Sequence, residues 1–433
     1  MNLARLAAER MEAKGPIGVA VIGAGKFGSM FLTQAPSSPG MRVVAVADLD
    51  VDRARRAATH VGWNDAYTAG CTFTDDGEAA IARDDVEVVV EATGNPAAGI
   101  RHALAAIEHG KHIVMVNVEA DVLAGTALAK RARAAGVVYT LAYGDQPALV
   151  AEQVDWARSC GFAVTAAGKG TKYMPDYHAS TPDEVWHHFG IAPERAIAAG
   201  MNPQMFNSFV DGTKSAIEMV AIANACDLAV PSDGLTFPPV GADELAEKLR
   251  PAEFGGLLER RGMVETVSSL NRDGTEVAKD LRWGVYVVFE ALTDYAASCF
   301  EQYGLKTDST GRFASLYRPY HLIGLELGVS VLSAALRGEA TGSNTGFRGD
   351  AVAVAKRGLK KGEMLDGEGG YTVWGKAWPG AKSLAYGALP IGLAHRVPLT
   401  RDIPEGTVLT WNDVEIGDNQ AVSLRREAEG LGI

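Results

Sequence analysis

The stretch Ile17–Gly28, IGVAVIGAGKFG, decides the fold of this chain. An apolar run leads into the glycine pattern, and a helical pattern follows it. This order predicts a strand, a tight turn and a helix that bind a dinucleotide pyrophosphate, in preference to a glycine-rich turn of another α/β unit. Gly23 permits the turn, Gly25 lets the backbone approach the phosphates, and Gly28 lets the helix pack closely on the strand. The predicted cofactor ligands in this loop are Gly23, Gly25, Lys26, Phe27 and Gly28.

A second apolar run, residues 42–47, ends in Asp48, twenty residues after Gly28. A carboxylate at this position accepts hydrogen bonds from an adenosine ribose. Asp48 is therefore a further predicted cofactor ligand.

The composition fits an ordinary globular protein of 433 residues, which is too long for one core and predicts two or three domains. The net charge of −12 argues against a general nucleic-acid binder. Four well-separated cysteines form no CxxC pair, so we expect a reducing cytoplasm rather than a zinc or redox motif. No apolar run is long enough to span a membrane, and the N-terminal stretch lacks a signal-peptide core.

Apolar runs alternate with helical patterns from residue 17 to about 142. The alternation predicts a doubly wound parallel sheet. Its expected strands are 17–22, 42–47, 86–90, 112–116 and 137–142, and its expected helices lie near 28–34, 51–60, 97–109 and 122–135.

Two of these strands end in polar residues that the sheet topology brings to its ligand-binding carboxyl edge. Thr93 and Gly94 follow one strand, and we expect them at the nicotinamide ribose. Asn117 and Glu119 follow the next strand and are predicted cofactor ligands as well. The alternative is that Asn117 and Glu119 only begin a loop.

The remainder divides into an irregular α+β part and a small β-rich part. An apolar helix is expected near 321–336, and the Gly-, Ser- and Asn-rich segment 340–348 is interpreted as a linker. The predicted fold class is α/β: an N-terminal Rossmann doubly wound sheet, an α+β catalytic domain and a small β-rich module. The predicted domains are 1–150, 151–345 and 346–433.

The order of these segments resembles the homoserine dehydrogenase-like oxidoreductases. Within them it is most similar to the 1-deoxy-D-xylulose 5-phosphate reductoisomerase-like branch, which carries a C-terminal SAF domain. Asn117 is followed by Val118, where homoserine dehydrogenases usually have lysine, and this favours the second branch. The matching stretches are KHIVMVNVEADVLAG (111–125), YGDQPALV (143–150), GKGTKYMPDYH (168–178), MNPQMFNSFVDGTKSAIEM (201–219), YRPYHLIGLELGVSV (317–331) and the C-terminal DIPEGTVLTWNDV.

The resemblance implies NADPH-dependent conversion of 1-deoxy-D-xylulose 5-phosphate into 2-C-methyl-D-erythritol 4-phosphate, in a homo-oligomer. Asp48 normally repels the 2′-phosphate of NADPH, although Arg53, Arg55 and Arg56 lie just beyond it and can compensate. The choice between NADPH and NADH therefore stays open.

A helix interpreted over residues 211–226 places Asp211, Lys214 and Glu218 along one face of an otherwise apolar segment. Burying these charges is costly unless they pair or work. We expect Lys214 to act as general acid on a carbonyl oxygen, with Asp211 and Glu218 tuning it. The alternative is an ion pair at an exposed helix start.

Further residues are candidates for substrate binding. Lys169 and Lys172 are interpreted as flanking a short turn that suits a phosphate or carboxylate, or as a solvated basic turn. The other candidate substrate ligands are Asn207, Arg318 and His321. A divalent metal is possible but not indicated, because neither the pattern of His178, His187 and His188 nor that of Asp145, Glu152 and Glu218 has informative spacing.

The sequence thus predicts an NAD(P)H-dependent oxidoreductase acting on a small phosphorylated hydroxycarbonyl compound. Two alternatives remain open: a homoserine dehydrogenase-like enzyme acting on a hydroxy acid or sugar acid, and a dinucleotide sensor without turnover.

Overall fold

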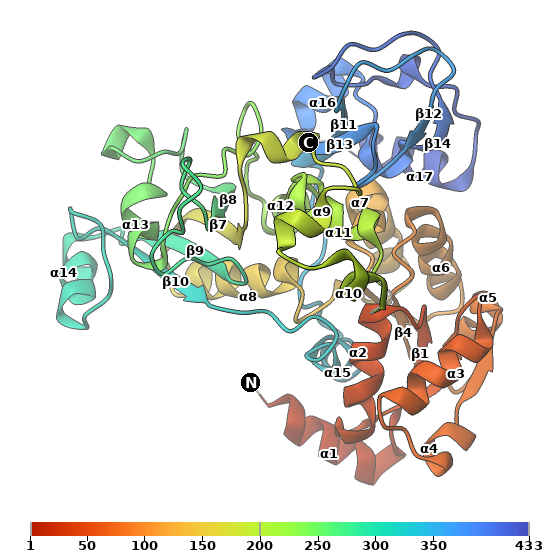
Figure 1. The fold of residues 1–433 in the computed structure, drawn as a ribbon. Helices are drawn as coiled ribbons and strands as arrows, with labels where there is room; N and C mark the ends of the chain where they lie inside the picture. Colours follow the sequence, from red (N-terminus) through yellow and green to blue (C-terminus); the bar gives the residue numbers. More distant parts are fainter. Residues whose placement is uncertain (1, 199–200, 432–433) are drawn as a thin grey trace. The chain divides into compact units, whose positions relative to one another are not determined.

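The computed structural model describes residues 2–198 and 201–431 of the chain. These residues form two compact units (Figure 1). The first unit contains the chain up to Glu152, together with His321–Thr345 and Gln420–Leu431. The second unit contains Gln153–Tyr320 and Gly346–Asn419. Among the described residues, no helix has the length and apolar character needed to cross a membrane.

The first unit is built on a six-stranded parallel sheet of order β3-β2-β1-β4-β5-β6. The predicted doubly wound sheet is therefore confirmed. The sequence pattern missed one strand, β3, which has only three residues and a single buried side chain. The strands are β1 (Ile17–Ile22), β2 (Met41–Ala47), β3 (Thr72–Thr74), β4 (Val88–Glu91), β5 (His112–Met115) and β6 (Tyr139–Leu141).

Helices follow the strands of the sheet, as βα alternation requires. One further helix, α8 (Gln146–Ser159), runs from the first unit into the second. The helices of the first unit are α1 (Leu3–Lys14), α2 (Lys26–Gln34), α3 (Val51–His60), α4 (Asp65–Ala69), α5 (Gly77–Ile81), α6 (Pro96–Glu108), α7 (Val118–Ala134), α15 (Gly328–Arg337) and α17 (Gln420–Gly430).

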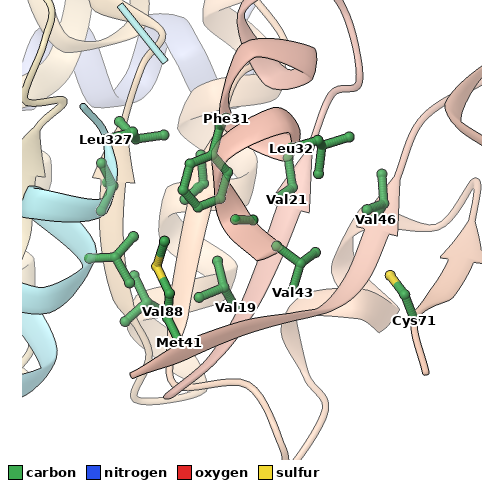
Figure 2. Packing of buried hydrophobic residues seen from close by; sticks show 14 of the residues in the cluster. Val19, Val21, Phe31, Leu32, Met41, Val43, Val46, Cys71, Val88 and Leu327 are labelled. Atoms are coloured by element: carbon green, nitrogen blue, oxygen red, sulfur yellow. The ribbon is translucent and has the colours of Figure 1, made fainter. Parts of the chain in front are cut away.

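The core of the first unit explains why its strands read as continuous apolar runs. Every residue of β1 is buried, because a parallel sheet is covered on both faces. Figure 2 shows Val19 and Val21 of β1 beside Phe31 of α2. Leu327, just before α15, belongs to the same cluster. The segment after residue 320 thus returns to complete the core of the six-stranded parallel sheet.

Two local predictions in this returning segment are wrong. The helix expected near 321–336 begins only at Gly328, because the chain turns at Gly324 with a φ of 79°, where a Cβ would lie 2.6 Å from the Cβ of Met30. The segment 340–348 is not a free linker. The Leu141 N–H donates to the Gly342 carbonyl at 2.7 Å, and Asn344 is buried.

The second unit contains a four-stranded mixed sheet of order β10-β9-β7-β8. Its strands are β7 (Ala163–Thr171), β8 (Met263–Ser268), β9 (Val285–Glu290) and β10 (Phe313–Arg318). Its helices are α9 (Val185–Phe189), α10 (Pro193–Ala198), α11 (Pro203–Val210), α12 (Thr213–Cys226), α13 (Leu245–Lys248), α14 (Asp294–Gln302) and α16 (Gly380–Tyr386).

The segment Gly346–Asn419 is β-rich, as predicted, and lies in the second unit. It pairs β11 (Gly349–Ala355) with β13 (Val373–Pro379), and β12 (Met364–Asp366) with β14 (His395–Pro398), both antiparallel. The domain boundaries at 150 and 345, and the SAF-like nature of this segment, stay predictions.

Candidate functional site

The glycine loop after β1 has the shape that a dinucleotide needs. Gly23 has a φ of 96°, and a Cβ on Gly28 would lie 2.1 Å from the Gly23 carbonyl oxygen. By contrast, a Cβ on Gly25 would meet no atom of the described residues within 4 Å, apart from its own chain neighbours. Turn and packing thus require the two outer glycines, whereas Gly25 borders open space where α2 begins. These residues fit a bound pyrophosphate, with Lys26 and Phe27 forming the first residues of the helix.

Asp48, at the end of β2, is buried and holds this loop in place. Its Oδ2 accepts the Ala24 N–H at 2.9 Å, and its Oδ1 accepts the Asp50 N–H at 3.0 Å. The Arg53 guanidinium donates to the same Oδ1 at 2.6 Å, while 57% of its side chain stays exposed. The carboxylate charge is therefore neutralised by an arginine that can also reach solvent or a ligand.

Two of the residues predicted at the carboxyl edge of the sheet, Thr93 and Asn117, lie in one hydrogen-bonded group. The Asn117 amide donates to the Thr93 hydroxyl oxygen at 3.3 Å and to the Asn95 carbonyl at 2.9 Å. Its own oxygen caps α7 by accepting the Ala120 N–H. Gly94 is exposed beside them with a φ of 68°, and Glu119 is half-buried in the first turn of α7. Asn117 thus does two things at once: its oxygen caps the start of α7, and its amide holds Thr93 by a hydrogen bond.

Sequence reasoning missed the two side chains beneath this group. Thr93 donates its hydroxyl to Glu91 at 2.6 Å, and Glu91 lies 3.1 Å from Nδ1 of His102. Glu91 is fully buried, and its Oε2 has no hydrogen-bond partner among the described residues. The apolar run around Glu91 hid it, although a carboxylate inside a buried strand is itself a signal of a polar partner.

In the second unit, Lys169 on β7 and Glu218 on α12 form a close ion pair in which both side chains are buried. Lys214 lies one helical turn before Glu218 and is half-buried. The residues Lys169 and Lys172 do not flank a turn, because β7 continues to Thr171. The glycines there serve close packing instead: a Cβ on Gly170 would lie 1.9 Å from the Leu281 carbonyl oxygen.

Asp211 does not lie on the helix of Lys214, contrary to the prediction. It is the C-cap residue of α11. Gly212 then has a φ of 89°, which interrupts the helical backbone before α12 begins at Thr213. Its carboxylate pairs with Lys356 Nζ at 2.8 Å, and both side chains are buried. Lys356 lies 145 residues further along the chain, so no local pattern pointed to it.

Two predicted substrate ligands, Asn207 and Lys172, donate their side-chain hydrogens to backbone carbonyl groups. The amide of Asn207 donates to the carbonyls of Ser180 and Gly369, both at 2.9 Å, and the residue is fully buried. Lys172 donates to the His188 carbonyl at 2.7 Å. Burial lowers the pKa of Lys172, and the nearby Arg282 guanidinium lowers it further.

The last two predicted substrate ligands are partly exposed. Arg318 ends β10, with its guanidinium 5.1 Å from the centre of the Tyr320 ring. His321 belongs to the first unit. The structure therefore groups the predicted site residues into a cofactor set in the first unit and a charged set around α12 in the second.

A small cavity of about 200 Å³ also lies in the second unit, next to Gly212 and Ala216. His178 lines it and stacks on Trp374, with ring centres 3.8 Å apart. Its Nδ1 lies 2.7 Å from the Asp211 carbonyl and its Nε2 lies 3.0 Å from the Tyr173 hydroxyl. We assign the Nδ1–H tautomer from these partners, which agrees with burial lowering the pKa of His178.

Within residues 2–198 and 201–431, no three His, Cys, Asp or Glu side chains gather in a way that could hold a metal ion. The carboxylates considered from the sequence, including Glu218, therefore form no such cluster among these residues.

Comparisons with known proteins match two consecutive parts of the chain to two different family models. Residues 23–142 match the family model of the homoserine dehydrogenase NAD-binding domain, and residues 144–327 match that of the oxidoreductase DRL catalytic domain. The chain is therefore an NAD(P)-binding oxidoreductase. No curated protein matches it.

Several solved structures are similar to part of this chain. A 3-ketoreductase from Actinomadura kijaniata in complex with NADP and TDP-benzene is 22% identical over 37% of this chain and 48% of its own, with a TM-score of 0.27. Myo-inositol dehydrogenase from Lactobacillus casei is 15% identical over 63% and 71%, with a TM-score of 0.35. A levoglucosan dehydrogenase is 14% identical over 70% and 66%, with a TM-score of 0.33. This chain spans about half the length of the first matched structure, and likenesses this distant carry no information on substrate.

Proposed function

We propose that this oxidoreductase uses NADPH to reduce a small phosphorylated hydroxycarbonyl compound, with 1-deoxy-D-xylulose 5-phosphate as substrate and 2-C-methyl-D-erythritol 4-phosphate as product. The match of residues 144–327 to the oxidoreductase DRL catalytic domain supports this choice of chemistry. The segment resemblances to the reductoisomerase-like branch support the choice of substrate.

The observation that carries the proposal is the charged group on α12. Burying the Lys169–Glu218 pair costs desolvation free energy that a packed apolar pair of the same size would avoid. Lys214 lies on the same helical face as Glu218, because residues four apart are neighbours on a helix. An ammonium that is half-buried near a fixed ion pair suits the stabilisation of a developing alkoxide.

The reaction would proceed in two stages. First, one carbon–carbon bond breaks and another forms, so that the hydroxyketone becomes a branched aldehyde without net oxidation or reduction. In the second stage the aldehyde carbon gains a hydride and its oxygen gains a proton. Bound NADPH supplies the hydride. Lys214 gives the proton to the alkoxide, and the Lys169–Glu218 pair keeps the surrounding charge fixed.

NADPH is preferred over NADH in this proposal because of Arg53. Its guanidinium neutralises Asp48, so the carboxylate does not confront the 2′-phosphate as a bare charge. More than half of the Arg53 side chain is exposed, which leaves donors available to a phosphate.

The test follows NADPH absorbance: its loss when NADPH is mixed with 1-deoxy-D-xylulose 5-phosphate, and its appearance when NADP+ is mixed with homoserine or with a panel of sugar acids and polyols. The proposal expects turnover with the phosphorylated hydroxyketone and formation of the branched polyol phosphate, identified by NMR. Lys214→Met should lower kcat by roughly 10²–10³, the usual effect of losing one such electrostatic group. The matched control is Lys360→Met, which removes an exposed lysine paired with Asp402.

If only homoserine or a sugar acid is turned over, the reductoisomerase proposal is wrong and the chain is a dehydrogenase of that substrate. Near-normal kcat in a folded Lys214→Met protein would remove Lys214 from the chemistry.

A further inference from the structure

The β-rich segment Gly346–Asn419 places one cation deep inside the second unit. Lys356 directly follows β11, and only 2% of its side chain is exposed. An ammonium this deeply buried is rare unless its charge and its three hydrogens are matched.

The ammonium group of Lys356 makes two hydrogen bonds and one ion pair within the unit. Nζ donates to the Ser180 carbonyl at 2.6 Å and to the Gly370 carbonyl at 2.7 Å. The third contact is the ion pair with Asp211 Oδ2 at 2.8 Å, which is not aligned as a hydrogen bond. Asp211 has no exposed surface. The pair is therefore a closed arrangement with no access for a substrate.

The other atoms of Asp211 set the start of α12. Its Oδ1 accepts the Thr213 N–H at 2.9 Å, and its carbonyl accepts the His178 Nδ1–H at 2.7 Å. Thr213 in turn accepts the Gly375 N–H at 2.8 Å through its hydroxyl oxygen. The first residue of α12 is thus held both by Asp211 and by strand β13 of the β-rich segment.

We infer that Lys356 is a positioning residue for the reaction: it is the buried counter-ion that fixes Asp211, the start of α12 and, through that helix, Lys214 and Glu218. The inference rests on the proposed role of Lys214. It also gives the β-rich segment a function, because this segment supplies the cation on which the catalytic helix is anchored. Asp211 becomes an anchoring group rather than a group that tunes Lys214 during the reaction.

The reason that this placement matters for rate is geometric. A displacement of about 1 Å of a reacting group can cost on the order of 10²-fold in rate. Lys214 is only two residues from the Gly212 break, so a loosened first turn moves it directly. The dinucleotide loop lies in the other unit, so cofactor binding should not respond.

The test compares three variants of the full-length protein. Lys356→Met leaves Asp211 buried and uncompensated, and this variant alone can fail to fold. The double variant Lys356→Met/Asp211→Asn removes both charges at similar volume. Lys360→Met, in the same segment but exposed, is the control. The readouts are the NADPH dissociation constant, amide hydrogen exchange of residues 211–217, and kcat and KM.

In the double variant we expect at least tenfold faster exchange at residues 211–217, at least a tenfold lower kcat, and a dissociation constant and KM changed by less than threefold. Unchanged exchange would overturn the anchoring of α12. Faster exchange with unchanged kcat would reduce Lys356 to a purely structural role. If the wild-type protein turns over none of the tested substrates, the proposed function fails, whereas the exchange data still decide whether Lys356 anchors the helix.

Discussion

Gly25→Ala separates cofactor binding from folding, because a Cβ on this glycine would touch no described residue beyond its two chain neighbours. A Cβ there meets nothing within 4 Å, and the residue has a φ of −71°, which alanine adopts without strain. We therefore expect the unliganded protein to keep its stability and to lose its dinucleotide.

The magnitudes follow from the contacts at stake. Loss of the N-cap preference costs a few tenths to about 1 kcal/mol, and the reduced freedom of the unfolded chain returns about 0.4–1 kcal/mol. The net change in the free energy of unfolding should stay within about 1 kcal/mol. A methyl group in the space of the pyrophosphate breaks at least two charge-assisted hydrogen bonds of about 1.5 kcal/mol or more each. A total of about 3 kcal/mol corresponds to more than a 100-fold rise in the dissociation constant.

Calorimetric titration with NADPH and thermal unfolding of the apoprotein measure the two quantities. Gly28→Ala is the matched control, since its Cβ would lie 2.1 Å from the Gly23 carbonyl oxygen. That variant should lose stability even without cofactor, by about 1–3 kcal/mol for an overpacked site. An NADPH affinity within threefold of wild type in Gly25→Ala would refute the placement of the pyrophosphate.

Two further predictions concern the first unit. Arg53→Ala should weaken NADPH roughly tenfold, since one partly exposed charge-assisted hydrogen bond contributes about 1.5 kcal/mol, and should leave NADH within threefold; an unchanged NADPH/NADH preference would exclude Arg53 from the 2′-phosphate site. Burial raises the pKa of Asp121 to about 6 from an ordinary value of 3.8, so the folded state binds the extra proton and stability falls as the pH rises from about 4 to 6. Asp121→Asn should abolish this loss of unfolding free energy, which amounts to up to about 3 kcal/mol at pH 8. Urea unfolding at pH 4.5 and at pH 8 measures it. If the pH dependence of the variant equals that of the wild type, the loss belongs to other groups.

The dinucleotide-binding half of the fold could be predicted from the sequence because its signals are local. Each buried parallel strand is a short apolar run, and each helix lies next to it in the chain. The glycine pattern and Asp48 belong to one βαβ unit of about thirty residues. Asp48 was correctly located at the end of β2, but its contacts with Ala24 and Arg53 required coordinates.

Glycine was the least reliable signal in the second unit. Gly170 was interpreted as part of a turn between Lys169 and Lys172, yet it lies inside β7, as does Gly168. A Cβ at either position would lie 1.9 Å from a carbonyl oxygen of a neighbouring segment, Glu265 or Leu281. A sequence records that a side chain is missing, but it does not record whether a backbone torsion or a neighbouring backbone excluded it.

For the charged residues around α12, the sequence predicts that compensating cations are needed, but it does not identify which lysines supply them. An apolar helix that carries Glu218, with Asp211 two residues before its first turn, requires two compensating cations if it is buried. The nearest lysine in the chain, Lys214, was the natural candidate. In the structure Glu218 pairs with Lys169 of strand β7, and Asp211 pairs with Lys356, which directly follows strand β11. Both of these cations come from segments far from the carboxylates in the chain, so the helical pattern that identifies the carboxylates cannot identify the cations.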